Sequence, residues 1–300
     1  MPRSILAAMA GLSCLLAATL AQADGRQVEL KIGGHMALAD LAVPEGGSVE
    51  NGVLLITHGT LAHKDMEIVE ALQQAFAERG IATLAHSLTF SVDRRKGMYD
   101  CAVPHRHAHG DGVAEIAAWA DWLRANGAKK VWVLGHSRGG NQVAWFAAEK
   151  GGVDKVVLLA PALSLPGKAA VDILKQRFDA DILPELKKAS ALVAQGKGET
   201  MLDVPAFVMC QGGKASARSI VSFYGEDPKR DGIANIRRIE APVLVIAAGK
   251  DTAVPDVPER IKPVADGKKV RLAVVDGADH MFLDFFADDA AELVAEFLKE

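Results

Sequence analysis

The chain has 300 residues, half of them hydrophobic, and a formal net charge of −4. This length is enough for one large hydrophobic core. The slightly acidic balance gives no sign of a nucleic-acid partner, which would normally require a basic face. These bulk properties leave a globular enzyme or a globular binding protein.

The first 23 residues have the pattern of a secretory signal peptide. Arg3 precedes an apolar stretch over residues 5–20, and Ala21-Gln22-Ala23 matches the small-x-small site that a signal peptidase cleaves. The stretch is short for a membrane span, so we expect no integral membrane segment in the mature chain. Lipidation of Cys14 is the alternative, and the residues before it match that signal poorly. We expect cleavage after Ala23 and a periplasmic or secreted mature chain, residues 24–300.

The mature chain opens with the pattern of an antiparallel hairpin and continues as alternating strands and helices. Residues 27–32 and 36–43 alternate apolar and polar side chains around Gly33-Gly34. The uninterrupted apolar run over residues 53–56 predicts a strand that is covered on both faces. Further strands are expected over residues 81–85, 131–134, 156–159, 243–247 and 270–275. Helical periodicity covers residues 65–79, 111–126, 138–150, 257–264 and 286–298.

Such alternation predicts an α/β fold with a mostly parallel sheet and helices on both faces. It lapses between about residues 161 and 236, where helical stretches occur without a convincing buried strand. We therefore expect one domain, residues 24–300, with a small helical cap inserted over residues 161–236.

The motif Gly135-His136-Ser137-Arg138-Gly139 is the strongest chemical signal. A G-x-S-x-G match is common by chance, but here an expected strand enters it and an expected helix leaves it. A sharp strand-to-helix turn strains the serine backbone, and the two glycines leave room for it. Such a turn raises the hydroxyl to the edge of the sheet, so we predict that Ser137 is a nucleophile.

A serine nucleophile needs a histidine base and a carboxylate that orients the histidine. Asp251 directly follows the strand over residues 243–247, and His280 directly follows the strand over residues 270–275. Both positions are at carboxyl ends of strands, and their chain order matches Ser, Asp, His. Asp276 and Asp279 are minor alternatives for the acid, because they lie too close to His280 in sequence to orient it easily.

The loop after the first parallel strand, His58-Gly59-Thr60-Leu61, should help to bind the oxyanion. Gly59 lets the backbone approach the site, and the N–H of Thr60, or failing that of Leu61, is the expected donor beside the N–H of Arg138. We assign His58, Gly59 and His136 to substrate contact. His136 has a structural role as its alternative, because neighbouring side chains on a tight turn diverge.

Together, the order of elements, the His58-Gly59 loop, the Ser137 turn and the placing of Asp251 and His280 resemble the α/β-hydrolase family. The resemblance runs from about Gln27 to the C-terminus. It implies cleavage of an ester-like bond through an acyl-enzyme, without a cofactor and on a small-molecule substrate.

The same motifs also indicate which subgroups of the family this chain does not resemble. The oxyanion motif is not a run of glycines, so a hormone-sensitive-lipase-like subgroup is not supported. A serine nucleophile argues against epoxide hydrolases and haloalkane dehalogenases, which attack with aspartate. Thioester, amide and carbon–carbon hydrolysis stay open as alternatives, as does a catalytically silent binding protein.

Two further features predict how substrates are selected. The histidines of His105-Arg106-His107-Ala108-His109 lack a partner at metal-binding spacing, so we expect no metal and a solvated or substrate-facing loop. With Arg138, they predict a preference for esters that carry negative charge, unless Arg138 projects into solvent. Cys101 and Cys210 remain after signal cleavage, and we expect a disulfide that ties the cap to the core; two unpaired thiols are the alternative.

Overall fold

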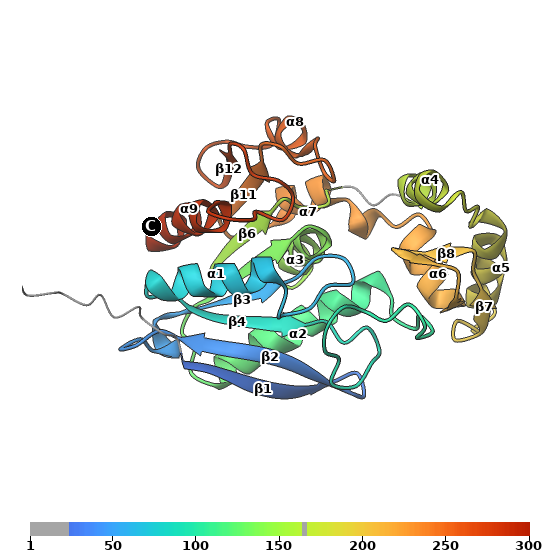
Figure 1. The fold of residues 1–300 in the computed structure, drawn as a ribbon, viewed down its shortest axis with the longest axis horizontal. Coiled ribbons are helices and arrows are strands. Elements are labelled where there is room, and N and C mark those ends of the chain that lie inside the picture. Colours follow the sequence, from blue (N-terminus) through green and yellow to red (C-terminus); the bar gives the residue numbers. More distant parts are fainter. Residues whose placement is uncertain (1–23, 164–166) are drawn as a thin grey trace, which may run out of the picture.

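The computed structural model describes residues 24–163 and 167–300 and is built on one eight-stranded sheet (Figure 1). The expected signal peptide, residues 1–23, lies outside the described residues. The strands follow one another across the sheet in the order β1-β2-β4-β3-β5-β6-β11-β12. Their bounds are β1 (Asp24–Ile32), β2 (His35–Val43), β3 (Val53–Thr57), β4 (Ala82–Ser87), β5 (Val131–His136), β6 (Lys155–Leu159), β11 (Val243–Ala248) and β12 (Val270–Val275).

The sheet is mostly parallel, as the uninterrupted apolar strands predict. β1 and β2 form the expected antiparallel hairpin, and β2 also pairs antiparallel with β4. From β4 to β12 all neighbouring strands are parallel. The carboxyl ends of these parallel strands therefore meet at one edge of the sheet.

Helices cover both faces of the sheet, and each face has its own hydrophobic core. On one face Leu72 and Phe76 of α1 and Val294 of α9 pack together on the strands. On the other face Ile116 and Trp119 of α2 pack with residues of α3, α7 and α8. The bounds are α1 (Glu67–Glu78), α2 (His109–Ala125), α3 (Arg138–Glu149), α7 (Gly232–Arg238), α8 (Val257–Ile261) and α9 (Phe286–Lys299), with single turns η1 (Val49–Asn51) and η2 (Pro228–Arg230).

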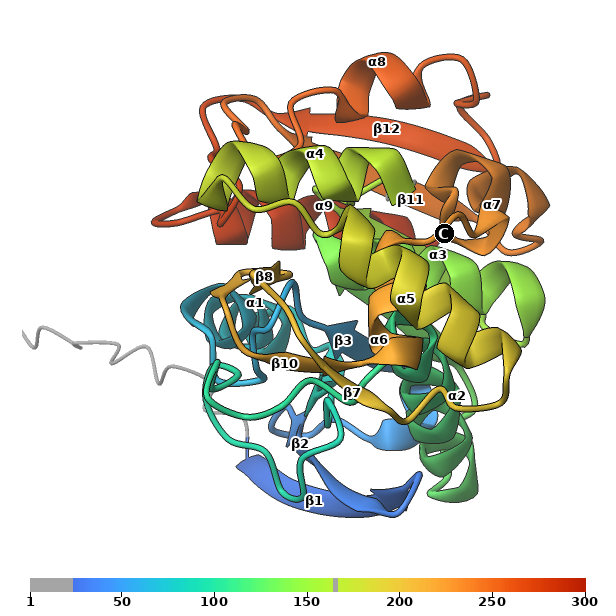
Figure 2. The same cartoon turned by 90° about the vertical axis from the view of Figure 1, so that its right-hand side faces the viewer.

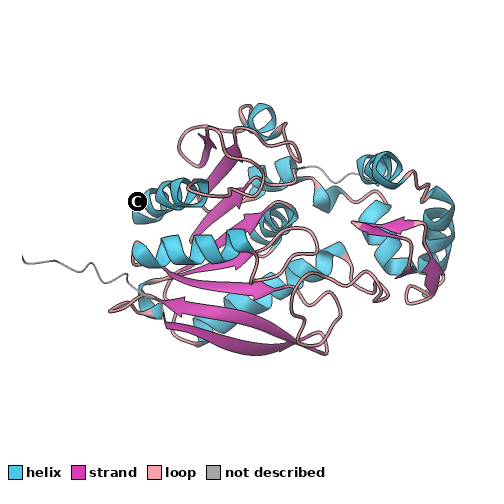
Figure 3. Ribbon diagram, viewed as in Figure 1, coloured by secondary structure: helices cyan, strands magenta, loops and turns pink. Residues whose placement is uncertain are grey.

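Between β6 and β11 the chain leaves the sheet and forms a cap, drawn at the right of Figure 1 and facing the viewer in Figure 2. The expectation that the cap lacks strands is wrong, because two small two-stranded sheets occur there, β10 with β7 and β8 with β9 (Figure 3). The cap elements are α4 (Gly167–Phe178), α5 (Leu183–Ala194), β7 (Met201–Asp203), β8 (Ala206–Phe207), β9 (Cys210–Gln211), β10 (Lys214–Ser216) and α6 (Ala217–Tyr224).

The cap has a hydrophobic core of its own, to which the long loop between β4 and α2 contributes. Phe207 and Ile220 of the cap are fully buried in the same cluster as Leu88 and Tyr99 of that loop. In contrast, Ile236 of α7 packs into the core beneath the sheet. The part of the insertion that stands away from the sheet thus ends before α7.

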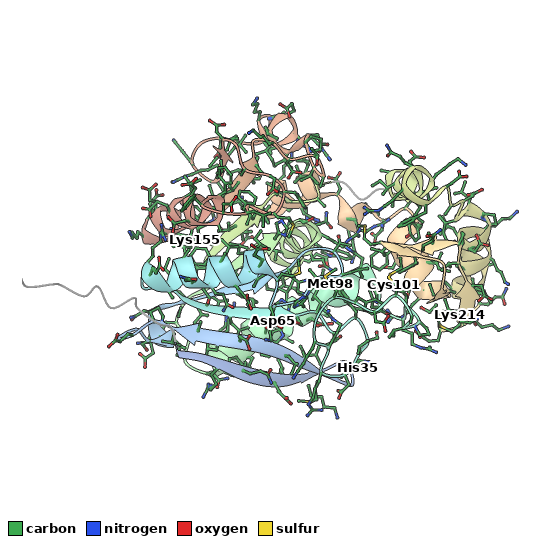
Figure 4. All side chains as sticks on the ribbon, in the orientation of Figure 1. His35, Asp65, Met98, Cys101, Lys155 and Lys214 are labelled. Atoms are coloured by element: carbon green, nitrogen blue, oxygen red, sulfur yellow. A yellow bond between two sulfur atoms is a disulfide. The ribbon has the colours of Figure 1, made fainter. Side chains whose placement is uncertain are left out.

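A disulfide joins Cys101 of the long loop to Cys210 of β9, the pair expected from the sequence, with a Cα–Cα distance of 5.4 Å. Figure 4 labels Cys101 at the boundary between the cap and the rest of the molecule. The covalent link therefore crosses the seam between the cap and the core.

Candidate active site

Ser137 lies in a strained turn between β5 and α3. Its φ and ψ are 56° and −120°, a conformation that a side chain other than glycine rarely adopts. Such strain costs about 1–3 kcal/mol and persists only where the surroundings enforce it. Here the Ser137 carbonyl accepts from Gly140 and Ala162 (3.0 and 2.9 Å), while its N–H donates to Leu159 (3.0 Å).

The glycines of the motif make this turn possible. A Cβ built on Gly135 would lie 2.4 Å from the Gly139 carbonyl oxygen, and one built on Gly139 would lie 2.3 Å from the His58 carbonyl oxygen. No side chain fits at such distances. The turn is thus packed backbone against backbone, as the sequence motif predicts.

Three side chains from three strand ends meet in one chain of hydrogen bonds. His280 Nε2 lies 2.9 Å from Ser137 Oγ, and His280 Nδ1 lies 2.8 Å from Asp251 Oδ2. Because an ionised carboxylate only accepts, Asp251 fixes the proton on Nδ1 and leaves Nε2 free to accept from the serine. The structure therefore brings together the three residues singled out in the sequence.

Backbone groups hold the Asp251 carboxylate and its loop in place. Oδ1 accepts from the N–H groups of Ala253 and Val254 at 2.7 and 2.9 Å. The neighbouring Lys250 N–H donates to the Ala278 carbonyl at 2.8 Å, which joins the aspartate loop to the histidine loop. Asp251 is almost fully buried, so its geometry is set before any ligand arrives.

The alternative acids are placed differently. Asp276 and Asp279 are both exposed. Asp279 Oδ1 accepts from the Met281 N–H at 3.0 Å, which shapes the turn after His280. Within the described part of the chain, neither carboxylate forms a hydrogen bond with the imidazole ring.

The expected oxyanion loop lies against the nucleophile. A Cβ built on Gly59 would lie 3.2 Å from Ser137 Cβ, a tighter contact than most Cβ atoms make, so glycine favours this close approach. The N–H groups of Thr60 and Leu61 donate to no other group among the described residues. Arg138 is the first residue of α3, where the N–H has no intrahelical acceptor. Free backbone donors are therefore available on both sides of Ser137.

His58 and His136, assigned above to substrate contact, are buried and support the loops of the site instead. His58 Nδ1–H donates to the Gly59 carbonyl at 2.9 Å, and its Nε2 accepts from Leu88. His136 Nε2–H donates to the His280 carbonyl at 2.9 Å. Burial lowers the pKa of His136 to about 4, so this ring stays neutral.

The segment His105 to His109 is not the solvated loop expected above. All three histidines are buried. His105 pairs with Ala215 of β10, and His109 is the first residue of α2. The His105 ring stacks on Tyr99 and lies 4.5 Å, centroid to centroid, from Phe207. The three histidines therefore mark a buried segment at the seam that leads into α2.

Two buried polar residues at the seam escaped the sequence analysis. Asn141 of α3 donates to the carbonyls of Ala162 and Arg230 at 3.0 and 2.9 Å and bonds the His109 ring. Glu115 of α2 accepts from the N–H and hydroxyl of Thr89. Neither stands in a recognisable motif, so only their spatial neighbours distinguish them from ordinary helix residues.

The described residues contain no group of three or more His, Cys, Asp or Glu side chains placed to hold a metal ion. Among them there is also no helix both long and apolar enough to cross a membrane.

Comparisons with known proteins agree with the fold described above. A family model described as "Alpha/beta hydrolase family" matches residues 53–297. A search of curated proteins finds no match.

Similar solved structures include esterases. Est1E from Butyrivibrio proteoclasticus, with ferulic acid bound, is 20% identical with a TM-score of 0.66 over 90% of this chain and 97% of that chain. The Pyrococcus furiosus esterase Pf2001 is 20% identical with a TM-score of 0.58 over 92% of each chain. The alpha/beta hydrolase GrgF from Penicillium sp. sh18 is 16% identical with a TM-score of 0.63 over 92% of this chain and 96% of that chain. At these identities the likeness establishes the fold.

Proposed function

This chain belongs to the alpha/beta hydrolase family, and we propose that it is a serine hydrolase that cleaves a carboxylic ester through an acyl-enzyme. One observation carries the proposal, namely the continuous hydrogen-bonded chain from Asp251 through His280 to Ser137. The esterases among the similar structures support an ester as the substrate.

In the first half of the reaction, Ser137 Oγ attacks the acyl carbon while His280 Nε2 takes the hydroxyl proton. Asp251 holds the Nδ1 proton and stabilises the imidazolium that forms. The N–H groups of Thr60 and Arg138 bind the oxyanion of the tetrahedral intermediate, a role that their lack of other acceptors supports. The intermediate then collapses, and His280 gives its proton to the departing alcohol.

In the second half, a water molecule takes the place of the alcohol. His280 accepts one water proton as the oxygen attacks the acyl-enzyme, and the intermediate collapses with return of that proton to Ser137 Oγ. The net reaction consumes one water and releases an alcohol and a carboxylic acid. No group outside the described residues is needed for either proton transfer.

We further propose that the enzyme acts in the periplasm or outside the cell, after removal of residues 1–23. The pattern of those residues supports this, as does the cysteine pair, because disulfides persist in oxidising compartments. Protein from the periplasmic fraction should begin at Asp24; a cytoplasmic protein that retains Met1 would contradict the proposal.

Labelling with a fluorophosphonate tests whether Ser137 is activated. The purified protein should gain one adduct by intact mass, mapped to Ser137, and Ser137→Ala should gain none and lose about 10⁴- to 10⁶-fold in turnover of a 4-nitrophenyl ester. Ser190→Ala, on the exposed face of α5, serves as the matched control and should be labelled like the wild type.

Failure to label would identify a silent binding protein. Matched esters, thioesters and amides of graded acyl length would then show which bond a labelled enzyme cleaves. A thioester or amide hydrolysed faster than every ester would overturn the ester assignment while leaving the nucleophile intact.

A further inference from the structure

The side chain of Arg138, next to the nucleophile, is a cation with unused hydrogen-bond donors. Its Nε donates to Thr60 Oγ1 at 3.0 Å, and its guanidinium carbon lies 5.3 Å from the centroid of the Phe223 ring. Neither Nη group donates to another described residue, and no carboxylate among those residues forms an ion pair with it. Arginine has five donors, so most of this capacity is open.

The surroundings of Arg138 make it costly to leave its side-chain donors without an acceptor. Burial, with a smaller contribution from the charge of Arg230, lowers the pKa of Arg138 to about 10, so the group remains a cation at neutral pH. Arg230 itself donates to the backbone carbonyls of Phe223 and Gly225 and adds no negative charge. Half-burying a cation beside a second cation is unfavourable unless an anion joins them.

A small cavity of about 30 Å³ opens beside the Arg138 side chain, between the core and the cap. Tyr224 and Phe223 of α6 line it together with Val208 and three apolar residues of α4, namely Ala170, Ile173 and Leu174. This volume corresponds to about two water-sized spheres, which is the room that the two oxygens of a carboxylate require.

Tyr224 supplies a second unused donor in the same cavity. Its side chain is 3% exposed, and its hydroxyl oxygen accepts from the Val208 N–H at 2.6 Å. The hydroxyl proton has no acceptor among the described residues. Burial raises the pKa of Tyr224 to about 12, so the proton is retained at neutral pH. Two residues from different elements, each with an unused donor, therefore line one small cavity.

We propose that Arg138 and Tyr224 form a subsite that binds a carboxylate of the substrate, so that the enzyme selects esters carrying a negative charge. The proposal rests on the proposed ester hydrolysis, and it places the charge beside the scissile bond because Arg138 directly follows Ser137. The apolar residues of α4 would cover a short aliphatic or aromatic stretch between the two groups.

A purely structural role for Arg138 explains fewer of these observations than a role in ligand binding does. The bond to Thr60 and the contact with Phe223 tie the core to the cap, but they use only Nε and one face of the guanidinium. A structural tie leaves both Nη groups and the Tyr224 proton without a function. An anionic ligand satisfies both at once.

The test compares esters that differ only in charge. On the acyl side, 4-nitrophenyl hydrogen adipate is compared with its neutral amide, 4-nitrophenyl adipamate. On the alcohol side, 4-acetoxybenzoate is compared with 4-acetoxybenzamide. The wild type should prefer the anionic ester of one pair by about tenfold or more in kcat/KM, since a hydrogen bond to a charged group is worth about that factor. The pair that responds locates the charge.

Variants then assign the preference. Arg138→Gln should lower the ratio of anionic to neutral kcat/KM by about 10- to 100-fold, and Tyr224→Phe by about 3- to 10-fold. Arg177→Gln removes a positive charge from the exposed end of α4 and should leave the ratio unchanged. Equal rates for both members of both pairs, or an unchanged ratio in Arg138→Gln, would overturn the subsite.

A binding measurement separates this proposal from the proposed function. Adipate should raise the Tm of Ser137→Ala, adipamide should not, and adding Arg138→Gln should abolish the effect. If no ester is hydrolysed but adipate still stabilises Ser137→Ala, the ester chemistry is wrong and the anion subsite stands. If esters are hydrolysed without charge preference and adipate has no effect, the subsite is wrong and the ester chemistry stands.

Discussion

The strand ends of the core and the seam under the cap differ in how completely their polar groups are paired. In the core, both oxygens of Asp251 and both nitrogens of His280 have partners at hydrogen-bond distance. At the seam, both ring nitrogens of His105 and His107 lack a partner among the described residues. The Nη groups of Arg138 are likewise open.

The difference in pairing suits the two regions to two different roles, catalysis and substrate binding. A complete set of partners fixes the geometry of the core groups in advance, which is what acid–base chemistry requires. Unused donors and acceptors at the seam cost free energy in the empty protein, and a ligand can recover it. We infer that bond cleavage depends on the core, and that the choice of substrate depends on the seam.

The largest effect is expected where a fully paired core group is changed. Asp251→Asn should lower kcat about 10⁴-fold with little change in KM, because the amide favours the wrong tautomer of His280. The bonds from Ala253 and Val254 to Oδ1 can persist, so the fold should survive. Steady-state kinetics on one ester gives both constants.

The matched controls are Asp276→Asn and Asp279→Asn, two exposed carboxylates near the same histidine. Each should retain activity within about tenfold of the wild type. If Asp276→Asn or Asp279→Asn abolished activity, that carboxylate, and not Asp251, would be the acid that orients His280.

A smaller effect is expected from cutting the covalent link across the seam. The disulfide closes a sequence separation of 109 residues, and its removal by Cys101→Ala with Cys210→Ala should cost about 2–4 kcal/mol in the free energy of unfolding. Urea unfolding measures the change. Bulky esters should gain relative to small ones, because the cap is no longer held over the site.

The wild type treated with reductant should match the double variant, and the double variant itself should not respond to reductant. Two free thiols in wild-type protein purified without reductant would contradict the link. Equal unfolding midpoints with and without the bridge would show that packing alone holds the seam.

The smallest expected effect is on how the stability of the fold depends on pH. Burial lowers the pKa of His105 to about 4 and that of His109 to about 3, against about 6.5 in an unfolded chain. The unfolded state thus binds protons first as the pH falls below about 6.5, so acid destabilises the fold. His105 alone should cost about 2 kcal/mol at about pH 5.

His105→Phe isolates this contribution, because phenylalanine can keep the stacking on Tyr99 and cannot titrate. Its stability should fall less than that of the wild type between neutral and acid pH. Burial raises the pKa of Glu115 to about 7, which acts in the opposite direction, and the comparison between the two proteins cancels it. Parallel pH curves would show that the His105 ring is hydrated or already charged.

The same division explains what the sequence could predict. The strand Val243–Ala248 was recognisable because a strand buried on both faces must be uniformly apolar, and the edge strand Val270–Val275 was recognisable as a mostly apolar run. Ser137, Asp251 and His280 followed, since each comes directly after such a strand. In these cases local sequence pattern and three-dimensional position carry the same information.

The seam could not be predicted in this way. β8 and β9 have two residues each, too few to show a period. His105 pairs with β10, which lies about a hundred residues further along the chain. Arg138 and Phe223 of α6 meet only because the cap folds back over the core. Such pairings depend on contacts that no local window contains.

Asn141 has a consequence for how this protein could be rebuilt. Its amide donates to Ala162, where the insertion leaves the core, and to Arg230, where it returns. Both stems of the cap are thus fastened to a single side chain on α3. Together with the Cys101–Cys210 disulfide, this side chain holds the cap on the core. A foreign cap spliced between residues 162 and 230 would dock on the same amide, offering a route to new substrates that leaves Ser137 and its partners untouched.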